Sequence, residues 1–121
     1  MTQTDQDIVQ LIISNKVYLS DEYIKKYLKR SDEMKWHVTV TREDLDRMMK
    51  LYDSKEINQA EFINWINFAH WSEYCQSERT DGSITSDVIT DLSTSFTAVP
   101  DDEYQKKYNL IKENMGNGFY D

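Results

Sequence analysis

Apolar residues recur at helical spacing along most of the chain. Ile8, Leu11 and Ile12 share one face of a predicted helix over residues 5–15, and a second such stripe follows Ser20. The sequence has three glycines and one proline, and all of them come after residue 81. Because few residues interrupt a helix before that point, the pattern predicts an all-α fold of amphipathic helices.

Capping signals mark where the next two helices start. Thr41 has Asp44 three residues later, and Asn58 has Glu61 three residues later, which is the spacing of a capping box. In a capping box each of the two side chains accepts a hydrogen bond from the backbone of the other residue. These signals predict a third helix after residue 41 and a fourth after residue 58 that runs to about Tyr74.

Short polar segments separate the helices in the second half of the chain. Residues 76–82 are predicted to be a loop, residues 83–97 a fifth helix, and the residues after Pro100 a sixth. Residues 36–40 alternate large apolar and polar side chains, which fits either a short strand or an extended link. Because no partner strand is obvious, we favour a link.

The length of 121 residues suits a single domain. A chain of this size buries enough apolar surface to fold without metals or disulfides. We expect an antiparallel helical bundle of about five to six helices. Residues 1–40 would form an N-terminal helical hairpin, residues 41–115 the core bundle and residues 116–121 a tail. The pattern does not decide whether residues 1–40 join the bundle or form a separate lobe.

Charge is distributed unevenly along the chain. It has 14 Lys and Arg against 22 Asp and Glu, a net charge of −8. Residues 56–103 hold ten acidic side chains and one basic side chain, Arg79, so the net charge of this segment is −9. Such a segment is either a solubilising surface or a patch that attracts a basic partner. We expect no direct nucleic-acid partner and no membrane partner, because both present negative charge.

Compartment signals favour the cytoplasm. The first residues, MTQTDQD, lack the basic and apolar regions of a signal peptide. The apolar runs are short, so we expect no membrane span. A single cysteine, Cys75, excludes an internal disulfide and suits a reducing compartment.

Catalytic motifs are missing from the sequence. It contains no P-loop, no G-x-G-x-x-G, no G-x-S-x-G and no H-E-x-x-H. His70, Glu73 and Cys75 crowd one helix end, and a small enzyme or metal protein built on them is one alternative. Two ligands on one helix face do not make a metal site, however. We therefore expect no enzyme activity, no cofactor, no metal and an inert Cys75.

The fourth helix is apolar nearly all round. Phe62 and Ile66 share one face, while Trp71 lies about 180° from Phe62 on the helical wheel. The helix is therefore either a central helix or the carrier of exposed aromatic side chains beside an acidic segment. In the second case we predict Trp71 as the aromatic anchor for a protein partner. The predicted contact residues are Glu73, Glu78, Asp81, Asp87, Asp91, Trp71 and Tyr74.

Residues 48–62, MMKLYDSKEINQAEF, resemble the second half of a helical hairpin in colicin D-type immunity proteins. The likeness extends over roughly residues 41–115. In size and charge the chain is also similar to immunity proteins of contact-dependent growth inhibition systems. The resemblance implies an antiparallel helical bundle that masks the active site of a cationic nuclease toxin, often one that cuts tRNA. It assigns no individual binding residue.

The sequence therefore predicts an immunity protein that neutralises a cognate basic nuclease through its acidic surface, and the resemblance implies that this nuclease is a tRNase. The oligomeric state is not predicted. One alternative is an acidic phage-encoded inhibitor of the anti-CRISPR kind that mimics nucleic acid. Another is a helical adaptor protein, for which Trp36 and Trp71 would both be buried.

Overall fold

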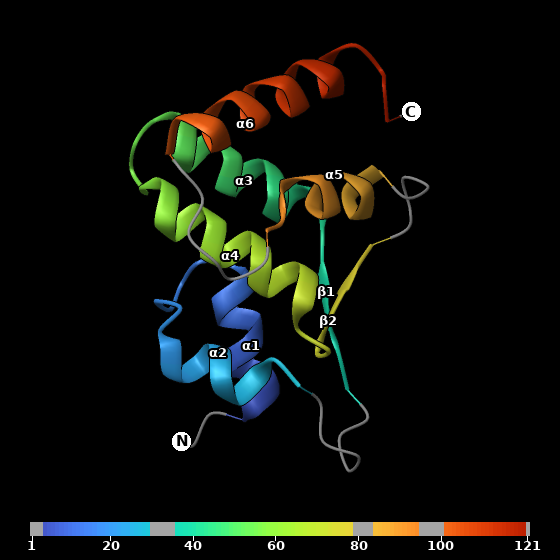
Figure 1. The fold of residues 1–121 in the computed structure, drawn as a ribbon. Coiled ribbons are helices and arrows are strands. Elements are labelled where there is room, and N and C mark those ends of the chain that lie inside the picture. The colour runs from blue at the N-terminus through green and yellow to red at the C-terminus, as the bar shows by residue number, and fades with distance from the viewer. Residues whose placement is uncertain (1–3, 30–35, 79–83, 95–100, 121) are drawn as a thin grey trace.

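The computed structural model describes residues 4–29, 36–78, 84–94 and 101–120. Helices dominate this part of the chain, so the predicted all-α class is right in its main feature, and a short two-stranded sheet is the exception (Figure 1). In chain order the elements are α1 (Asp5–Ile13), α2 (Asp21–Tyr27), β1 (Val38–Val40), α3 (Arg42–Asp53), α4 (Gln59–Trp71), β2 (Cys75–Ser77), α5 (Ile84–Leu92) and α6 (Asp101–Gly116).

Both predicted capping boxes are present. The Thr41 hydroxyl accepts a hydrogen bond from the Asp44 backbone N–H at 3.1 Å, and the Asp44 carboxylate accepts one from the Thr41 N–H at 2.9 Å. Asn58 and Glu61 make the same reciprocal pair at the start of α4, at 2.8 and 3.1 Å. α3 and α4 therefore begin directly after the residues that the capping signals name.

The sheet corrects the prediction of a link at residues 36–40. β1 pairs in parallel with β2, with Val38 opposite Cys75 and Val40 opposite Ser77. The predicted loop at residues 76–82 is therefore wrong at its start. Each strand has only three residues, and the two lie far apart in the sequence. Local alternation cannot reveal such a pairing, because parallel strands need a long connection between them.

Three helices end earlier than predicted, and the first of them, α1, ends at Ile13 rather than near Asn15. α4 ends at Trp71 rather than near Tyr74, because Ser72 takes an extended backbone conformation and its hydroxyl donates to the Tyr27 carbonyl at 2.5 Å. α5 ends at Leu92 rather than at residue 97. The last residues of that predicted helix, together with Pro100, lie outside the described residues.

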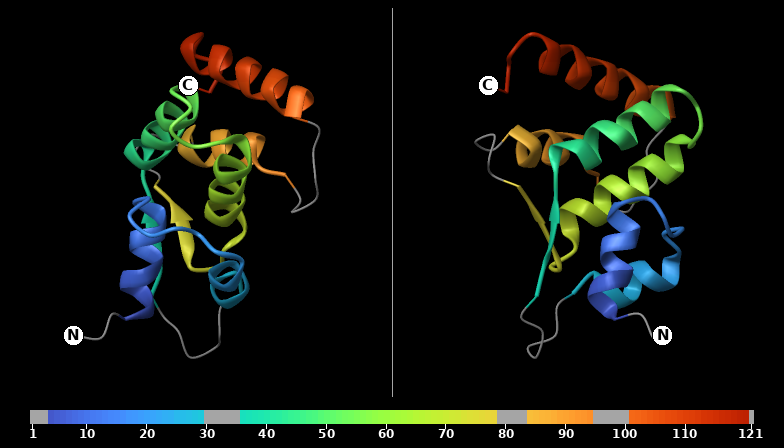
Figure 2. Two further views of the ribbon diagram at one scale, coloured as in Figure 1. Left: turned by 90° about the vertical axis from the view of Figure 1, so that its left-hand side faces the viewer. Right: turned by 180° about the vertical axis from the view of Figure 1, so that it is seen from behind.

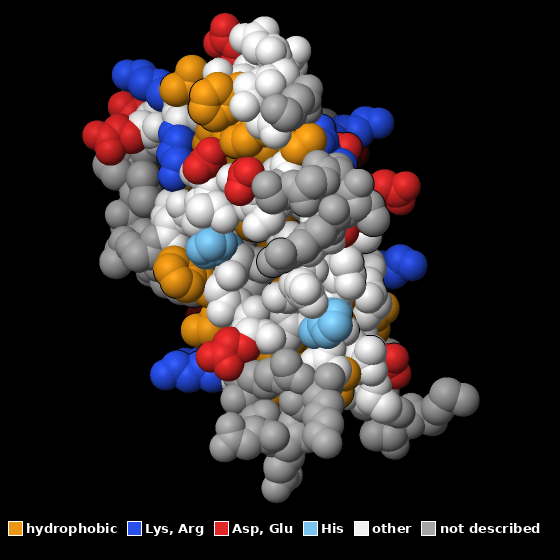
Figure 3. Space-filling model, turned by 90° about the vertical axis from the view of Figure 1, so that its right-hand side faces the viewer, with side chains coloured by type: hydrophobic (Ala, Val, Ile, Leu, Met, Phe, Trp, Pro, Cys, Tyr) orange, Lys and Arg blue, Asp and Glu red, His pale blue; other side chains and the backbone are white. Residues whose placement is uncertain are grey.

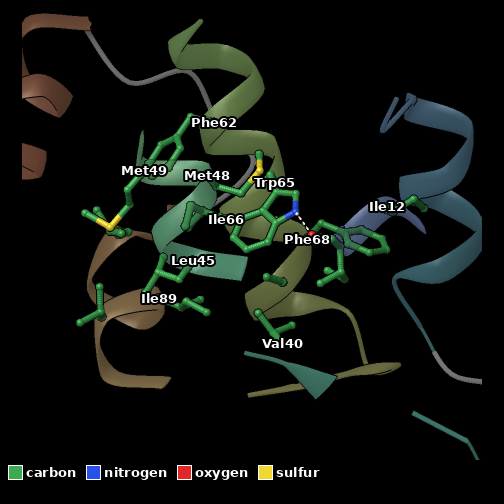
Figure 4. Packing of buried hydrophobic residues seen from close by; sticks show 14 of the residues in the cluster. Ile12, Val40, Leu45, Met48, Met49, Phe62, Trp65, Ile66, Phe68 and Ile89 are labelled. Atoms are coloured by element: carbon green, nitrogen blue, oxygen red, sulfur yellow. Dashed lines mark hydrogen bonds between the residues drawn. The ribbon is translucent and has the colours of Figure 1, made fainter. Parts of the chain in front are cut away.

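α6 lies at one end of the molecule, α1 and α2 lie at the other, and α3, α4 and α5 lie between them (Figure 2). α4 is central in this arrangement and contacts α3, α5 and β2. Phe62, Trp65, Ile66 and Phe68 of α4 are all buried (Figure 4). α4 is thus a central helix, as one of the two interpretations of its composition predicts.

The N-terminal helices share this core. Val9, Ile12 and Ile13 of α1 are buried in the same cluster as the α4 residues. The indole N–H of Trp65 donates to the Ile13 carbonyl at 3.2 Å, and the Arg47 guanidinium donates to the same oxygen at 3.0 Å. α3 and α4 therefore both bind the C-terminal end of α1. Within the described ranges, no helix has the length and apolar character to cross a membrane.

Candidate functional site

α5 carries two of the predicted contact residues on its outer side. Asp87 and Asp91 are one helical turn apart, and both are exposed. Val88, Ile89 and Leu92 are buried on the opposite side of the same helix. The amphipathic pattern of α5 thus holds the two carboxylates outward from the core, next to the C-terminal end of α6.

A groove runs between α5 and the end of α6. It comprises two adjoining hollows, of about 410 and 260 Å³, which share Thr90, Asp91, Phe119 and Tyr120 in their walls. Most of the wall on the α6 side is apolar. We call this surface the α5–α6 groove, and its lining residues are Asp87, Thr90, Asp91, Lys107, Leu110, Ile111, Asn114, Phe119 and Tyr120.

The segment that follows α6 is held against α5 by a hydrogen bond. The Tyr120 hydroxyl donates to the Asp91 carboxylate at 2.7 Å, and the Phe119 backbone N–H donates to the Asn114 carbonyl at 3.0 Å. The pKa of Tyr120 is raised to about 12. Burial of the ring is the main cause, and the hydrogen bond to the Asp91 carboxylate is the second. At neutral pH the phenol is therefore protonated and able to donate this bond.

Large apolar side chains are exposed beside these carboxylates. Leu110 is 58% exposed and Phe119 is 69% exposed. Figure 3 shows hydrophobic side chains gathered over α6 and its C-terminal end, with acidic side chains directly beneath them. Exposed apolar area bordered by charge is typical of a surface that binds another protein.

Trp71 lies at the surface, as expected of an anchor. Its side chain is 50% exposed. The indole N–H donates to the Thr94 carbonyl at 3.1 Å, which fixes the ring near the C-terminal end of α5. His70 packs edge-on against it, with ring centroids 4.6 Å apart. The adaptor alternative predicts that both Trp36 and Trp71 are buried. A Trp71 side chain that is half exposed does not fit that prediction.

The remaining predicted contact residues do not join this surface as a group. Tyr74 is 3% exposed and stacks on Trp36 with ring centroids 4.7 Å apart, so it has almost no area to offer a partner. The prediction of Tyr74 as a contact residue is therefore wrong, because Tyr74 belongs to the core. Glu73 is exposed in the turn after α4. Asp81 lies outside the described residues.

Glu78 binds the backbone at the start of α3. Its carboxylate accepts a hydrogen bond from the Arg42 backbone N–H at 2.6 Å, and the side chain is partly buried. A negative charge at this position also stabilises the positive end of the α3 dipole. Glu78 is therefore less accessible to a protein partner than Asp87 and Asp91, which are exposed.

The metal-protein alternative finds no support in the described residues. They contain no group of three His, Cys, Asp or Glu side chains placed to hold a metal ion. Burial raises the pKa of the Cys75 thiol to about 12, so the thiol is neutral and a poor nucleophile at neutral pH. Burial also lowers the pKa of His70.

Comparison with known protein families, with characterised proteins and with solved structures finds no match to this chain. The resemblance to colicin D-type immunity proteins stays a prediction from the sequence.

Sequence reasoning missed the α6 wall of the groove. Leu110, Phe119 and Tyr120 line it, although the predicted contact residues include none of them. The sequence does contain a sign of this wall, because two aromatic residues follow Gly118. A purely polar, solvent-exposed tail would have no aromatic residues there. Their position against α5 depends on the Tyr120–Asp91 hydrogen bond between residues far apart in the sequence.

Proposed function

We propose that this protein is an immunity protein, which binds a cognate basic nuclease toxin in a stoichiometric complex and neutralises it. The observation that carries the proposal is the juxtaposition on one surface of two exposed carboxylates, Asp87 and Asp91, with exposed Leu110 and Phe119. The nuclease would be one that cuts tRNA, as the resemblance implies.

The physical basis is competition for a basic active site. A nuclease must carry positive charge to hold phosphates, and carboxylates placed in that site exclude the RNA. Opposite charges also steer the two proteins together and raise the association rate. Exposed apolar side chains next to the carboxylates would then slow dissociation, because buried aromatic and aliphatic anchors supply much of the affinity in protein complexes.

In this role the helices act as an antiparallel bundle that holds the acidic surface in place. The protein works as a ligand of the toxin and not as an enzyme, and it needs no cofactor. Its site of action is the cytoplasm, where a nuclease that cuts tRNA meets its substrate.

The experiment combines the purified chain with the purified nuclease encoded beside its gene. We expect an equimolar complex in size-exclusion chromatography with light scattering, and loss of tRNA cleavage at one equivalent of the chain. Heat-denatured chain serves as the control for the effect of added negative charge. Undiminished cleavage in the presence of a large molar excess of folded chain would contradict the proposed function.

A further inference from the structure

We propose that the α5–α6 groove binds an arginine side chain and a neighbouring apolar side chain of a protein partner. The inference rests on the proposed function, since it names the chemistry by which the partner is recognised. It deepens that function by dividing the groove into an acidic half and an apolar half.

The acidic half is the smaller hollow. It measures about 260 Å³ and is lined by Asp87, Thr90, Asp91, Phe119 and Tyr120, with no basic side chain among these residues. Arginine presents five N–H donors in a planar fork that matches carboxylate geometry. The Tyr120 hydroxyl bonds one oxygen of Asp91. A carboxylate has about four acceptor positions, so Asp91 retains the capacity to accept from an arginine as well.

The aromatic wall fits the same ligand. Phe119 is 69% exposed and borders both hollows. A guanidinium stacks on an aromatic face while its edge donates hydrogen bonds, which an ammonium does less well. This combination of carboxylates and an exposed ring favours arginine over lysine.

The apolar half lies toward α6. Leu110 and Ile111 line the larger hollow of about 410 Å³. Lys107 also borders it, but its ammonium donates to the Ser93 carbonyl at 3.2 Å, beyond the C-terminal end of α5. Lys107 therefore shares the larger hollow with Asp91, while the smaller hollow, which both Asp87 and Asp91 line, has no lysine in its wall. A bound segment would place its arginine near Asp87 and its apolar side chain near Leu110.

Charge also selects against other occupants. Asp87 and Asp91 repel phosphates, so an RNA strand or an anionic membrane is a poor ligand for the acidic half. A second copy of this chain is the other protein that would fit the groove, and a titration without peptide distinguishes it from a basic partner.

The test is an NMR titration of the full-length ¹⁵N-labelled chain at low salt with acetyl-Leu-Arg-amide, and in parallel with acetyl-Leu-Gln-amide. The arginine peptide is expected to shift the amide signals of residues 87–91 and 110–120. It should bind about threefold to tenfold more tightly than the glutamine peptide, the range for one or two exposed ion pairs. Added salt should remove this difference.

Matched variants assign the effect to the groove. Asp87→Asn with Asp91→Asn should abolish the preference for arginine, and Phe119→Ala should weaken binding of both peptides. Glu22→Gln with Glu56→Gln makes the same charge change on α2 and in the turn before α4, away from the groove, and should preserve the preference. Equal affinity for the two peptides, or shifts confined to other residues, would overturn the inference.

Two further outcomes separate this inference from the proposed function. If the arginine peptide binds as expected but the nuclease is not inhibited, the groove assignment stands and the immunity function fails. If Asp87→Asn with Asp91→Asn leaves nuclease inhibition and affinity unchanged, the function stands and the groove is excluded as its binding site. Concentration-dependent shifts of residues 110–120 without peptide would assign the groove to a second copy and overturn the inference.

Discussion

Trp65→Ala is expected to lower the free energy of unfolding by about 3–5 kcal/mol, the range for removal of a large aromatic core side chain. Trp65 is 2% exposed and lies among residues of α1, α3 and α4 (Figure 4). Its indole N–H also donates to the Ile13 carbonyl at 3.2 Å. The substitution therefore removes buried ring area and a hydrogen bond that joins α1 to α4.

Urea denaturation followed by far-UV circular dichroism measures this loss. Trp65→Phe keeps a buried ring but lacks the N–H, so we expect a smaller loss, of about 1–2 kcal/mol. Because residues 4–29 share the core with α3 and α4, both variants should unfold in one transition. A first transition confined to the N-terminal helices, with the remainder as stable as in the unchanged protein, would contradict a single cooperative unit.

The largest functional effect is expected from Asp87→Lys combined with Asp91→Lys, which should weaken binding of the nuclease by about 100-fold. Close charge pairs in tight protein complexes contribute about 1.5 kcal/mol or more each. Loss of two such pairs amounts to about 3 kcal/mol, and each 1.4 kcal/mol corresponds to tenfold in affinity. Both side chains are exposed on α5, so the buried core should tolerate the change, while Asp91→Lys also removes the acceptor of the Tyr120 hydroxyl at the groove.

Stopped-flow association kinetics at several salt concentrations measure this effect. The variant should associate more slowly than the unchanged protein and show a weaker salt dependence. Glu22→Lys with Glu56→Lys changes the net charge equally and controls for long-range attraction. An equal loss in the two double variants would indicate a general charge effect and not a docking surface on α5.

Local signals explain why the helices could be predicted. The reciprocal bonds of Thr41 with Asp44, and of Asn58 with Glu61, form between residues three positions apart. The sequence therefore contains all that is needed to place the starts of α3 and α4. The outward position of Asp87 and Asp91 follows in the same way from the apolar spacing along α5.

Long-range contacts explain what could not be predicted. Val38 pairs with Cys75 across the sheet, and the burial of Tyr74 depends on its stacking with Trp36. The groove likewise needs Tyr120 bonded to Asp91. None of these pairs is adjacent in the sequence, and no periodic pattern records which partner a residue will meet. The sequence pattern therefore predicts Tyr74 at the surface, and it does not predict that Leu110 and Phe119 belong to the site.

The central claim is that the α5–α6 groove is the docking surface for a basic protein partner. Hydrogen–deuterium exchange of the complex with the nuclease, compared with the free chain, tests it most directly. We expect slower exchange in residues 84–94 and 110–120, with exchange in residues 4–29 unchanged. Slower exchange over α1 and α2, with α5 and the end of α6 exchanging as in the free chain, would contradict it.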